Sequence, residues 1–409
     1  MVRRFVKGRP QSCGLICDGQ KKAIERRRRV HRMYYDEGVS KTKIARGLGI
    51  SKAFVVQWTQ ACDQDLEQDA RGWPKGRARC WDEKVYGRIE RLHATLTTDP
   101  GEFFTGATAI QQRYRRRYPR SPVPPLRTIG RMLAELGLSS RRKQGRSKGA
   151  ARYLCYPEHT VYHRLGQRVM EADFVGKKYL AGRTAPVNFV GLCFKQVPKL
   201  RYFQRVTGET TAALIEVCQE FFERFETPDV IKVDNGAAAL GSGSAKRTVS
   251  RFMMFLLEKE ILPVFSVPKK PFSQASIEGN NSVFARKFWT TQTFQSLRTL
   301  DRRLGWFNAS SQRYTGYEPP SQQRPSRTKA FVPKVYFIRQ VRDDPNHGPC
   351  IDVLNEKIVL PVSYTNYFVL AEWNLKTERL AIFFEKDLQS KQIKSQKFTV
   401  NPNSRFNLH

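Results

Sequence analysis

The sequence predicts a multidomain α/β protein with an all-α N-terminal part, a central mixed sheet flanked by helices, and a small C-terminal β-barrel. The length of 409 residues suits two to four domains. The first 150 residues repeat helical periodicity interrupted by Gly-containing turns. After Val169, β-branched and aromatic segments first follow one another and then alternate with amphipathic ones, which is typical of a mixed sheet covered by helices.

The chain is strongly basic, with 72 Lys and Arg against 37 Asp and Glu. Residues 1–150 hold 34 of these cations and 14 of the anions. This excess indicates a polyanionic partner, although charge alone does not separate DNA from RNA or from an anionic membrane. No apolar run approaches 18 residues and the N-terminus lacks a secretory apolar core, so we expect a protein of the cell interior without a membrane span.

The eight cysteines are scattered along the chain, so free thiols are expected. Cys13 and Cys17 could supply two zinc ligands, but no second pair at zinc spacing follows.

A helix-turn-helix pattern is expected over residues 21–66. A first helical run ends at Gly38, a second helix follows Ser40, and "GIS" forms the turn before a third short helix. In a helix-turn-helix DNA-binding domain this last helix enters the major groove. An ordinary helical hairpin is the alternative. The residues expected to contact DNA are Ser51, Lys52 and Gln57.

A second helix-turn-helix-like unit is expected over residues 80–145. Its helices are "EKVYGRIERLHATL", "GATAIQQRYRRRYP" and "PPLRTIGRMLAELG", and the third is the expected reading helix. The basic tail "SSRRKQGRSKGAARY" is interpreted as a linker that follows DNA, with a merely solvated charge run as the alternative. The residues expected to contact DNA are Arg127, Thr128 and Arg131.

The central domain, residues 165–315, carries three carboxylates at the places where strands end or helices begin. Asp173 lies in the first strand, Asp234 follows "VIKV", and Glu278 opens a helix. Functional groups gather at strand ends in α/β sheets. Each acid also has a plainer reading: Asp234 before Asn-Gly as a turn former, Glu278 as charge at a helix N-terminus, and Asp173 as a hydrogen-bonded polar residue. Residues 330–390 form a series of short strands, from which we predict the β-barrel.

This constellation resembles the DDE transposase and retroviral-integrase superfamily, whose catalytic core has an RNase H-like fold. The resemblance covers residues 165–315, with Asp173 in the first strand, Asp234 in "VDNG", and Glu278 in "PKKPFSQASIE". The order of the parts also looks like bacterial insertion-sequence and Mu-type transposases. Glu171, two residues from Asp173, is the alternative acid; the family pattern favours Asp173.

Three departures from the family pattern are present. The interval between Asp234 and Glu278 is longer than usual, and "AALGSGSAKR" supplies the insertion. Ala275 replaces a frequent Gly. Ala285 stands where Lys or Arg is common, with Arg286 and Lys287 next to it.

The resemblance implies two-metal-ion chemistry. Asp173, Asp234 and Glu278 would hold two Mg²⁺ ions, for which Mn²⁺ can substitute, because hard divalent ions take oxygen ligands. Two ions about 3.5–4 Å apart can serve the attacking and leaving oxygens of an in-line displacement. The cations expected to grip DNA phosphates near the site are Lys269, Lys270, Arg286 and Lys287.

The predicted function is therefore a DNA transposase or integrase that cuts mobile-element ends to expose 3′-hydroxyls and joins them to target DNA. Implied partners are double-stranded DNA, further copies of the chain in a synaptic complex, and an accessory ATPase; the implied location is the cytoplasm, at a bacterial nucleoid. Two alternatives stay open: a catalytically inactive, domesticated transposase that binds DNA site-specifically, and an RNase H-like nuclease that hydrolyses without joining.

Overall fold

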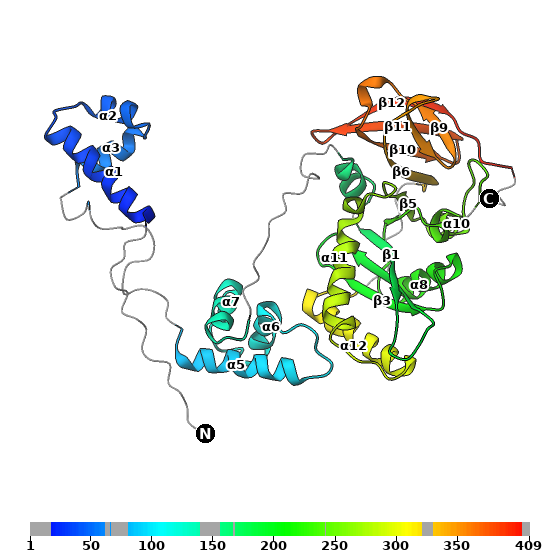
Figure 1. Ribbon diagram of the computed structural model, residues 1–409, viewed down its shortest axis with the longest axis horizontal. Coiled ribbons are helices and arrows are strands. Elements are labelled where there is room, and N and C mark those ends of the chain that lie inside the picture. The colour runs from blue at the N-terminus through cyan, green and yellow to red at the C-terminus, as the bar shows by residue number, and fades with distance from the viewer. Residues whose placement is uncertain are drawn as a thin grey trace. The chain divides into compact units, whose positions relative to one another are not determined.

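The computed structural model describes residues 18–61, 66, 81–139, 156–166, 168–241, 243–320 and 330–402 (Figure 1). The cysteine pair Cys13 and Cys17 and residues 140–153 of the basic tail lie outside this part. The chain divides into two compact units, Met1–Asp82 and Glu83–His409. Each unit is described by itself.

The first unit contains three helices in the described residues: α1 (Asp18–Tyr35), α2 (Lys41–Leu48) and α3 (Lys52–Thr59). Gly49 ends α2 in the left-handed region at φ 62°, a conformation that glycine adopts without strain. Val30, Ile44 and Val55, one from each helix, are fully buried together. Helical periodicity and one glycine thus account for this small core.

The second unit begins with α5 (Glu83–Thr98), α6 (Ala107–Arg117) and α7 (Leu126–Glu135). The loop after α5 packs against α12 (Leu297–Thr315), because the Phe103 ring lies edge-on to Phe307 at 5.2 Å between centroids. Glu102 accepts hydrogen bonds from Arg313 and from Ser310 of the same helix, each at 2.9 Å. Apolar stacking and an ion pair therefore join these helices to the sheet-containing part.

Within the described residues, nine strands form one mixed sheet in the order β12-β11-β10-β6-β5-β4-β1-β2-β3. Strands β1, β4, β5 and β6 are parallel, and both flanks are antiparallel. The bounds of the first five are β1 (Val169–Lys178), β2 (Val187–Phe194), β3 (Arg201–Val206), β4 (Val230–Val233) and β5 (Leu262–Phe265). The others are β6 (Lys334–Gln340), β10 (Phe368–Asn374), β11 (Arg379–Lys386) and β12 (Gln389–Lys397).

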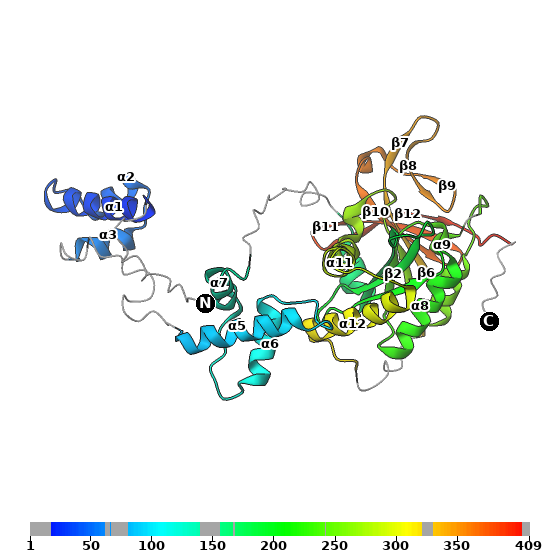
Figure 2. The ribbon, with the colours of Figure 1, turned by 60° about the horizontal axis from the view of Figure 1, so that its bottom comes forward.

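Helices cover both faces of the central strands, as Figures 1 and 2 show together. One face carries α8 (Thr211–Arg224), the short α9 (Ala237–Leu240) and α10 (Arg251–Glu258). The other carries α11 (Ala275–Phe284) and α12. β1 alternates accordingly: Met170 and Ala172 join the core beneath α8, while Glu171 and Asp173 point to the α11 side. The sheet therefore presents Asp173 to the helix that carries Glu278.

The C-terminal strands differ from the predicted independent barrel. β6 pairs with β5 in parallel, so β6, β10, β11 and β12 extend the core sheet. A second small sheet, seen at the upper side of Figure 2, comprises β7 (Arg342–Asp344), β8 (Gly348–Val353) and β9 (Glu356–Val359). Ile351 and Trp373 from the two sheets share one core with Phe252 of α10. Without β6, the backbone N–H and C=O groups on one edge of β5 would have no strand to pair with, and β6 supplies that strand.

Short turns of other helical type complete the described elements: η2 (Thr160–Arg164), η3 (Pro271–Gln274), η4 (Ala285–Trp289) and η5 (Val362–Tyr364). None of the described helices combines the length and apolar character needed to cross a bilayer.

Candidate active site

Two of the predicted acids lie on neighbouring parallel strands, with Asp173 inside β1 and Asp234 directly after β4. β1 and β4 pair so that Glu171 is opposite Lys232. Asp173 follows Glu171 by two residues on β1, and Asp234 follows Lys232 by two residues, just past the end of β4, so the alternation of the strands places both on the same side of the sheet. Because adjacent strands are about 4.8 Å apart, this register brings the two carboxylates close to one another.

The third acid approaches from the helix that covers these strands. Glu278 lies in the first turn of α11, which packs on β1 and β2. The preceding residue, Ile277, donates its backbone N–H to the Oε2 atom of Glu171 on β1, at 2.8 Å. Glu278 is thereby held above the strand that carries Asp173.

The electrostatics of Asp173 reflect these neighbours. Burial, followed by the negative charge of Asp234 and, more weakly, of Glu278, raises the pKa of Asp173 to about 7, although a hydrogen bond from Asn281 partly lowers it. Burial and the charge of Glu171 raise the pKa of Glu278 as well. The three acids therefore interact, and the protein meets a cost in keeping them all ionised.

Asn281, one turn of α11 beyond Glu278, is the amide that faces Asp173. Its Nδ2 atom donates to Oδ2 of Asp173 at 3.1 Å. In the part of the chain that the structure describes, Asn281 Oδ1 and both polar side-chain atoms of the buried Asn280 have no hydrogen-bond partner. Buried polar atoms without a hydrogen-bond partner are uncommon in folded proteins. These two asparagines therefore retain unused hydrogen-bonding capacity next to Asp173.

Glu171, the alternative acid, is engaged in a buried network. Its side chain is almost fully buried, and its Oε1 atom accepts from the Tyr162 hydroxyl at 2.6 Å. Lys232 Nζ donates to the same hydroxyl at 2.8 Å and also to the Ser273 carbonyl. Burial lowers the pKa of Lys232 to about 8, while the charge of Glu171 acts to raise it. Glu171 and Lys232 thus carry opposite charges in the protein interior. The Asp173 side chain, in contrast, is partly exposed to solvent.

Asp234 also forms the turn that the sequence allows as the plainer reading. It is exposed, and its Oδ1 atom accepts the N–H of Gly236 at 3.0 Å. This is an Asx turn, which asparagine or aspartate can form. The turn uses one carboxylate oxygen and is compatible with a ligand on the other.

The donor types suit a hard divalent ion, but the side chains do not stand in a ligating arrangement. Among the described residues, no group of three or more His, Cys, Asp and Glu side chains is placed to hold a metal ion. The raised pKa of Asp173 nevertheless indicates a position at which added positive charge is favourable. Carboxylate oxygens are the ligands that Mg²⁺ prefers.

The four cations predicted near the site lie at the ends of two segments beside it. Lys269 is exposed and Lys270 half-buried, just after β5. Arg286 and Lys287 are exposed on η4, a π-helical turn that continues α11. Arg286 Nε donates to the Ser282 carbonyl at 3.1 Å.

The cations and polar residues predicted to read DNA lie on the expected helices. Ser51 caps α3 by accepting the N–H of Phe54 at 3.2 Å, and Lys52 and Gln57 are exposed on that helix. On α7, Arg127 and Arg131 are exposed and Thr128 is half-buried. The Ser51 side chain therefore has a structural role beside any contact with DNA.

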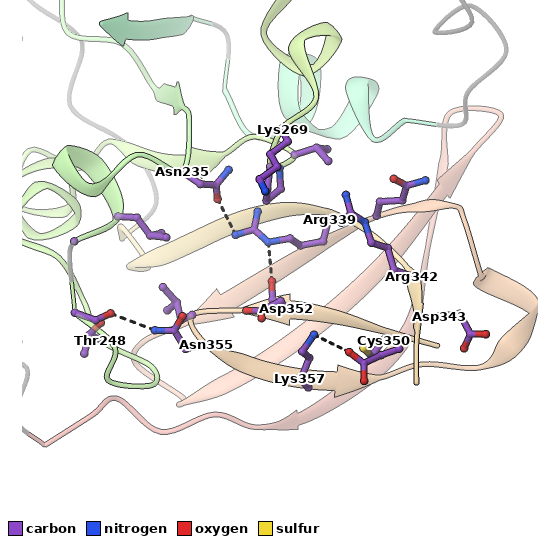
Figure 3. Close-up of a pocket in the computed structure, with 18 residues that line it drawn as sticks. Asn235, Thr248, Lys269, Arg339, Arg342, Asp343, Cys350, Asp352, Asn355 and Lys357 are labelled. Carbon is purple, nitrogen blue, oxygen red and sulfur yellow. Dashed lines mark hydrogen bonds and ion pairs between the residues drawn. The ribbon is translucent and has the colours of Figure 1, made fainter. Parts of the chain in front are cut away.

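A buried arginine, missed by the sequence reading, ties the C-terminal strands to the Asp234 loop. Arg339 of β6 donates to Oδ1 of Asn235 at 2.9 Å and to the Asp352 carbonyl at 2.7 Å (Figure 3). It also donates to the Ser266 carbonyl at 3.1 Å. Burial lowers the pKa of Arg339 to about 10. An Arg inside the otherwise apolar run "VYFIRQV" was the available sequence signal.

Figure 3 shows the cavity that Arg339 lines, which has a volume of ≈ 590 Å³. It lies between the loop after β4 and the small β7–β9 sheet. Its lining mixes cations with carboxylates, and Lys357 pairs with Asp344 at 3.0 Å. The mixture of charges does not select one ligand class.

Comparison with known proteins gives distant structural likeness. No protein-family model matches the chain, and no curated protein matches it. The chain is similar to a solved structure titled a simian T-cell lymphotropic virus intasome in complex with PP2A regulatory subunit B56 gamma, with 12% identity, a TM-score of 0.33, and coverage of 77% of this chain and 100% of that one. It is also similar to the HTLV-2 integrase catalytic core domain in complex with magnesium, with 13% identity, a TM-score of 0.25, and coverage of 34% of this chain and 84% of that one. At these scores the argument for function rests on the residues of this chain.

Proposed function

We propose that the protein is a DNA transposase or integrase that cuts mobile-element ends and joins the resulting 3′-hydroxyls to target DNA. The observation that supports the proposal is the raised pKa of Asp173, about 7, which is caused first by burial and then by the negative charges of Asp234 and, more weakly, Glu278. Negative charges brought together from three separate elements repel one another, and a bound cation would offset that repulsion.

In this proposal the three carboxylates hold divalent metal, Mg²⁺ or in its place Mn²⁺. When bound, the metal supplies activation of the attacking oxygen and stabilisation of the leaving oxygen in phosphoryl transfer. Asp173 provides the half-buried ligand, while the exposed Asp234 and Glu278 approach it from the β4 end and from α11. Asn281 orients Asp173 through its hydrogen bond.

The DNA contacts in the proposal come from two regions. The helices of residues 21–66 and 80–145 bind the element ends, chiefly through α3 and α7. Lys269, Lys270, Arg286 and Lys287 bind backbone phosphates near the reacting bond, because phosphate contacts fix register without reading sequence. Several copies of the chain would assemble on two ends, with an accessory ATPase as a possible partner in target choice.

Strand transfer with a matched variant tests the proposal. Purified protein is incubated with Mg²⁺ or Mn²⁺, a pre-nicked element-end duplex and a plasmid. Asp234→Asn is the chosen variant, because the asparagine Oδ1 still accepts the Gly236 N–H and preserves the turn. We expect joined product from the wild type and a loss of more than about 100-fold in the variant, since residues that merely support metal ligands already cost about 10–100-fold.

The other outcomes assign the alternatives. Nicking without joining would identify a nuclease that hydrolyses DNA. Equal activity of the wild type and Asp234→Asn would reduce Asp234 to a turn former. Tight end binding with neither reaction, in the presence of both metals, would identify a site-specific DNA-binding protein.

A further inference from the structure

Glu171 joins the strand of Asp173 to the first turn of the helix of Glu278, while the Asp173–Asn281 hydrogen bond joins the same two elements one turn further along. It lies two residues before Asp173 on β1 and accepts the backbone N–H of Ile277, the residue before Glu278. The Glu171 carboxylate therefore connects β1 to α11 at the turn that carries Glu278, and the separation of these two elements determines the separation of Asp173 and Glu278.

Helix α11 depends on this contact at its start. Gln274, at the N-cap position, makes no capping hydrogen bond with its own side chain. The first N–H groups of a helix have no partner within the helix and need one from elsewhere. Glu171 supplies that partner from the sheet, and its negative charge also suits the positive end of the helix dipole.

The Glu171 side chain is itself held in place by Tyr162 and Lys232. The Tyr162 hydroxyl donates to Oε1 of Glu171 at 2.6 Å. Lys232, opposite Glu171 on β4, donates to Tyr162 and to the Ser273 carbonyl, which belongs to η3 just before α11. Segment 273–277 is consequently held from two neighbouring strands, one bearing Asp173 and the other leading to Asp234.

We propose that Glu171 is a positioning residue that anchors α11 to the sheet and so determines where Glu278 stands relative to Asp173 and Asp234 when metal binds. Glu171 binds no metal or substrate; its carboxylate is consumed by Tyr162 and by the Ile277 N–H. The inference rests on the proposed metal-dependent function of the three acids. It gives Glu171, the alternative to Asp173 as a metal ligand, a positioning role instead.

The test separates positioning from stability with two variants. Glu171→Leu removes the cap but leaves Lys232 buried without its countercharge, so this variant can fail to fold. Glu171→Leu/Lys232→Met removes both buried charges and restores an apolar pair, which proteins often tolerate. Glu171→Gln keeps an oxygen that can accept the Ile277 N–H. The matched control is Glu226→Leu, which removes a largely buried carboxylate bonded to Arg168 at 2.6 Å, just before β1 begins.

Two readouts on the full chain do not require activity. Calorimetric titration with Mn²⁺ alone measures metal affinity, and hydrogen exchange read by mass spectrometry measures protection of peptides from residues 271–284. We expect the double variant to lose about 10-fold or more in Mn²⁺ affinity and to exchange faster over 271–284, while unfolding at a temperature close to that of the wild type. Glu171→Gln should stay within about 3-fold of the wild type, and Glu226→Leu should leave both readouts unchanged.

The failures are distinguishable. Absence of Mn²⁺ binding by the wild type, or binding that Asp234→Asn does not weaken, would refute the proposed function and this inference with it. Mn²⁺ binding that Asp234→Asn weakens but the folded double variant preserves would refute only the role of Glu171. Strand-transfer kinetics add a further check, because a positioning role lowers the joining rate while end-DNA affinity stays constant.

Discussion

Asp173 lies directly opposite Gly191 in the antiparallel pairing of β1 and β2. A Cβ atom at Gly191 would stand 2.9 Å from the Phe203 ring and 3.1 Å from Oδ1 of Asn281. Asn281 is the residue that donates to Asp173. Because Gly191 on β2 has no side chain, the Asn281 amide has room to approach and orient Asp173 on β1.

Gly191→Ala is expected to destabilise the protein and disturb the candidate site together. The added methyl group must displace Phe203 or Asn281, and overpacking of this kind costs about 1–3 kcal/mol. Urea denaturation measures the free energy of unfolding, and strand transfer measures activity. Gly176→Ala on β1 is the control, because a Cβ atom there meets nothing within 4 Å. Equal behaviour of the two variants would contradict the close approach at Gly191.

Asp173→Asn is expected to stabilise the metal-free protein at alkaline pH. The pKa of Asp173 is about 7 in the folded protein against 3.8 as its ordinary value. The favourable contribution of the protonated acid is therefore fully present below pH 3.8 and is lost as the pH rises through 7. Between pH 5 and pH 8 the free energy of unfolding of the variant should therefore rise relative to that of the wild type. The rise should be a few kcal/mol at most, since one pKa unit is about 1.4 kcal/mol.

Denaturation in EDTA at a series of pH values measures this difference. A gap that stays constant from pH 5 to pH 8 would show that Asp173 titrates normally. Added Mn²⁺ should stabilise the wild type more than Asp173→Asn, because binding to the folded state raises stability by mass action.

Arg339→Lys is expected to lower stability by at least about 2 kcal/mol. A lysine ammonium cannot replace the planar set of donors that reaches Asn235, Ser266 and Asp352 together. Each buried acceptor left unpaired costs about 1–3 kcal/mol. The control is Arg379→Lys, because the Arg379 side chain is exposed and donates to the Ser395 hydroxyl at 3.4 and 3.3 Å. Similar unfolding midpoints for the two variants would count against the Arg339 anchor.

Substitutions on α3 should separate affinity for DNA from sequence preference. Lys52→Ala is expected to weaken binding to every duplex and reduce the salt dependence by about one unit of slope, because one phosphate contact is lost. Gln57→Ala should instead reduce discrimination between the correct and a mutated end by about 1–3 kcal/mol. Fluorescence anisotropy at several salt concentrations measures both. Lys259→Ala, an exposed cation at the end of α10, is the control; a matching effect there would indicate a general charge effect.

The local elements of the central part were largely predictable, because periodicity and turn residues are local signals. "VIKV" before Asp-Asn-Gly is β4, and the helix expected to open near Glu278 is α11. The large mixed sheet with helices on both faces agrees with the predicted fold class. These features follow from alternation and from apolar spacing alone.

Long-range contacts were less accessible to sequence reasoning. Nothing in the run from Lys334 to Gln340 states that it pairs with β5 rather than closing a separate barrel, since strand pairing depends on which edge is free. The difference between Glu171 and Asp173 is likewise set by Tyr162, Lys232 and the α11 N-terminus, which are distant in sequence. A pattern of acids supplies candidates, and burial with its hydrogen bonds distinguishes among them.

The shared sheet has a consequence for dividing the chain. A fragment that stops at residue 315 would leave the β5 edge bare, with Val264 and Phe265 deprived of their neighbours Tyr336 and Phe337. A bare, apolar strand edge recruits another copy of itself, so such a fragment would tend to self-associate. A cut between residues 320 and 330 that keeps both pieces together should instead give a noncovalent, reconstituted protein. A fragment that keeps the whole sheet must therefore extend beyond β12, which ends at Lys397.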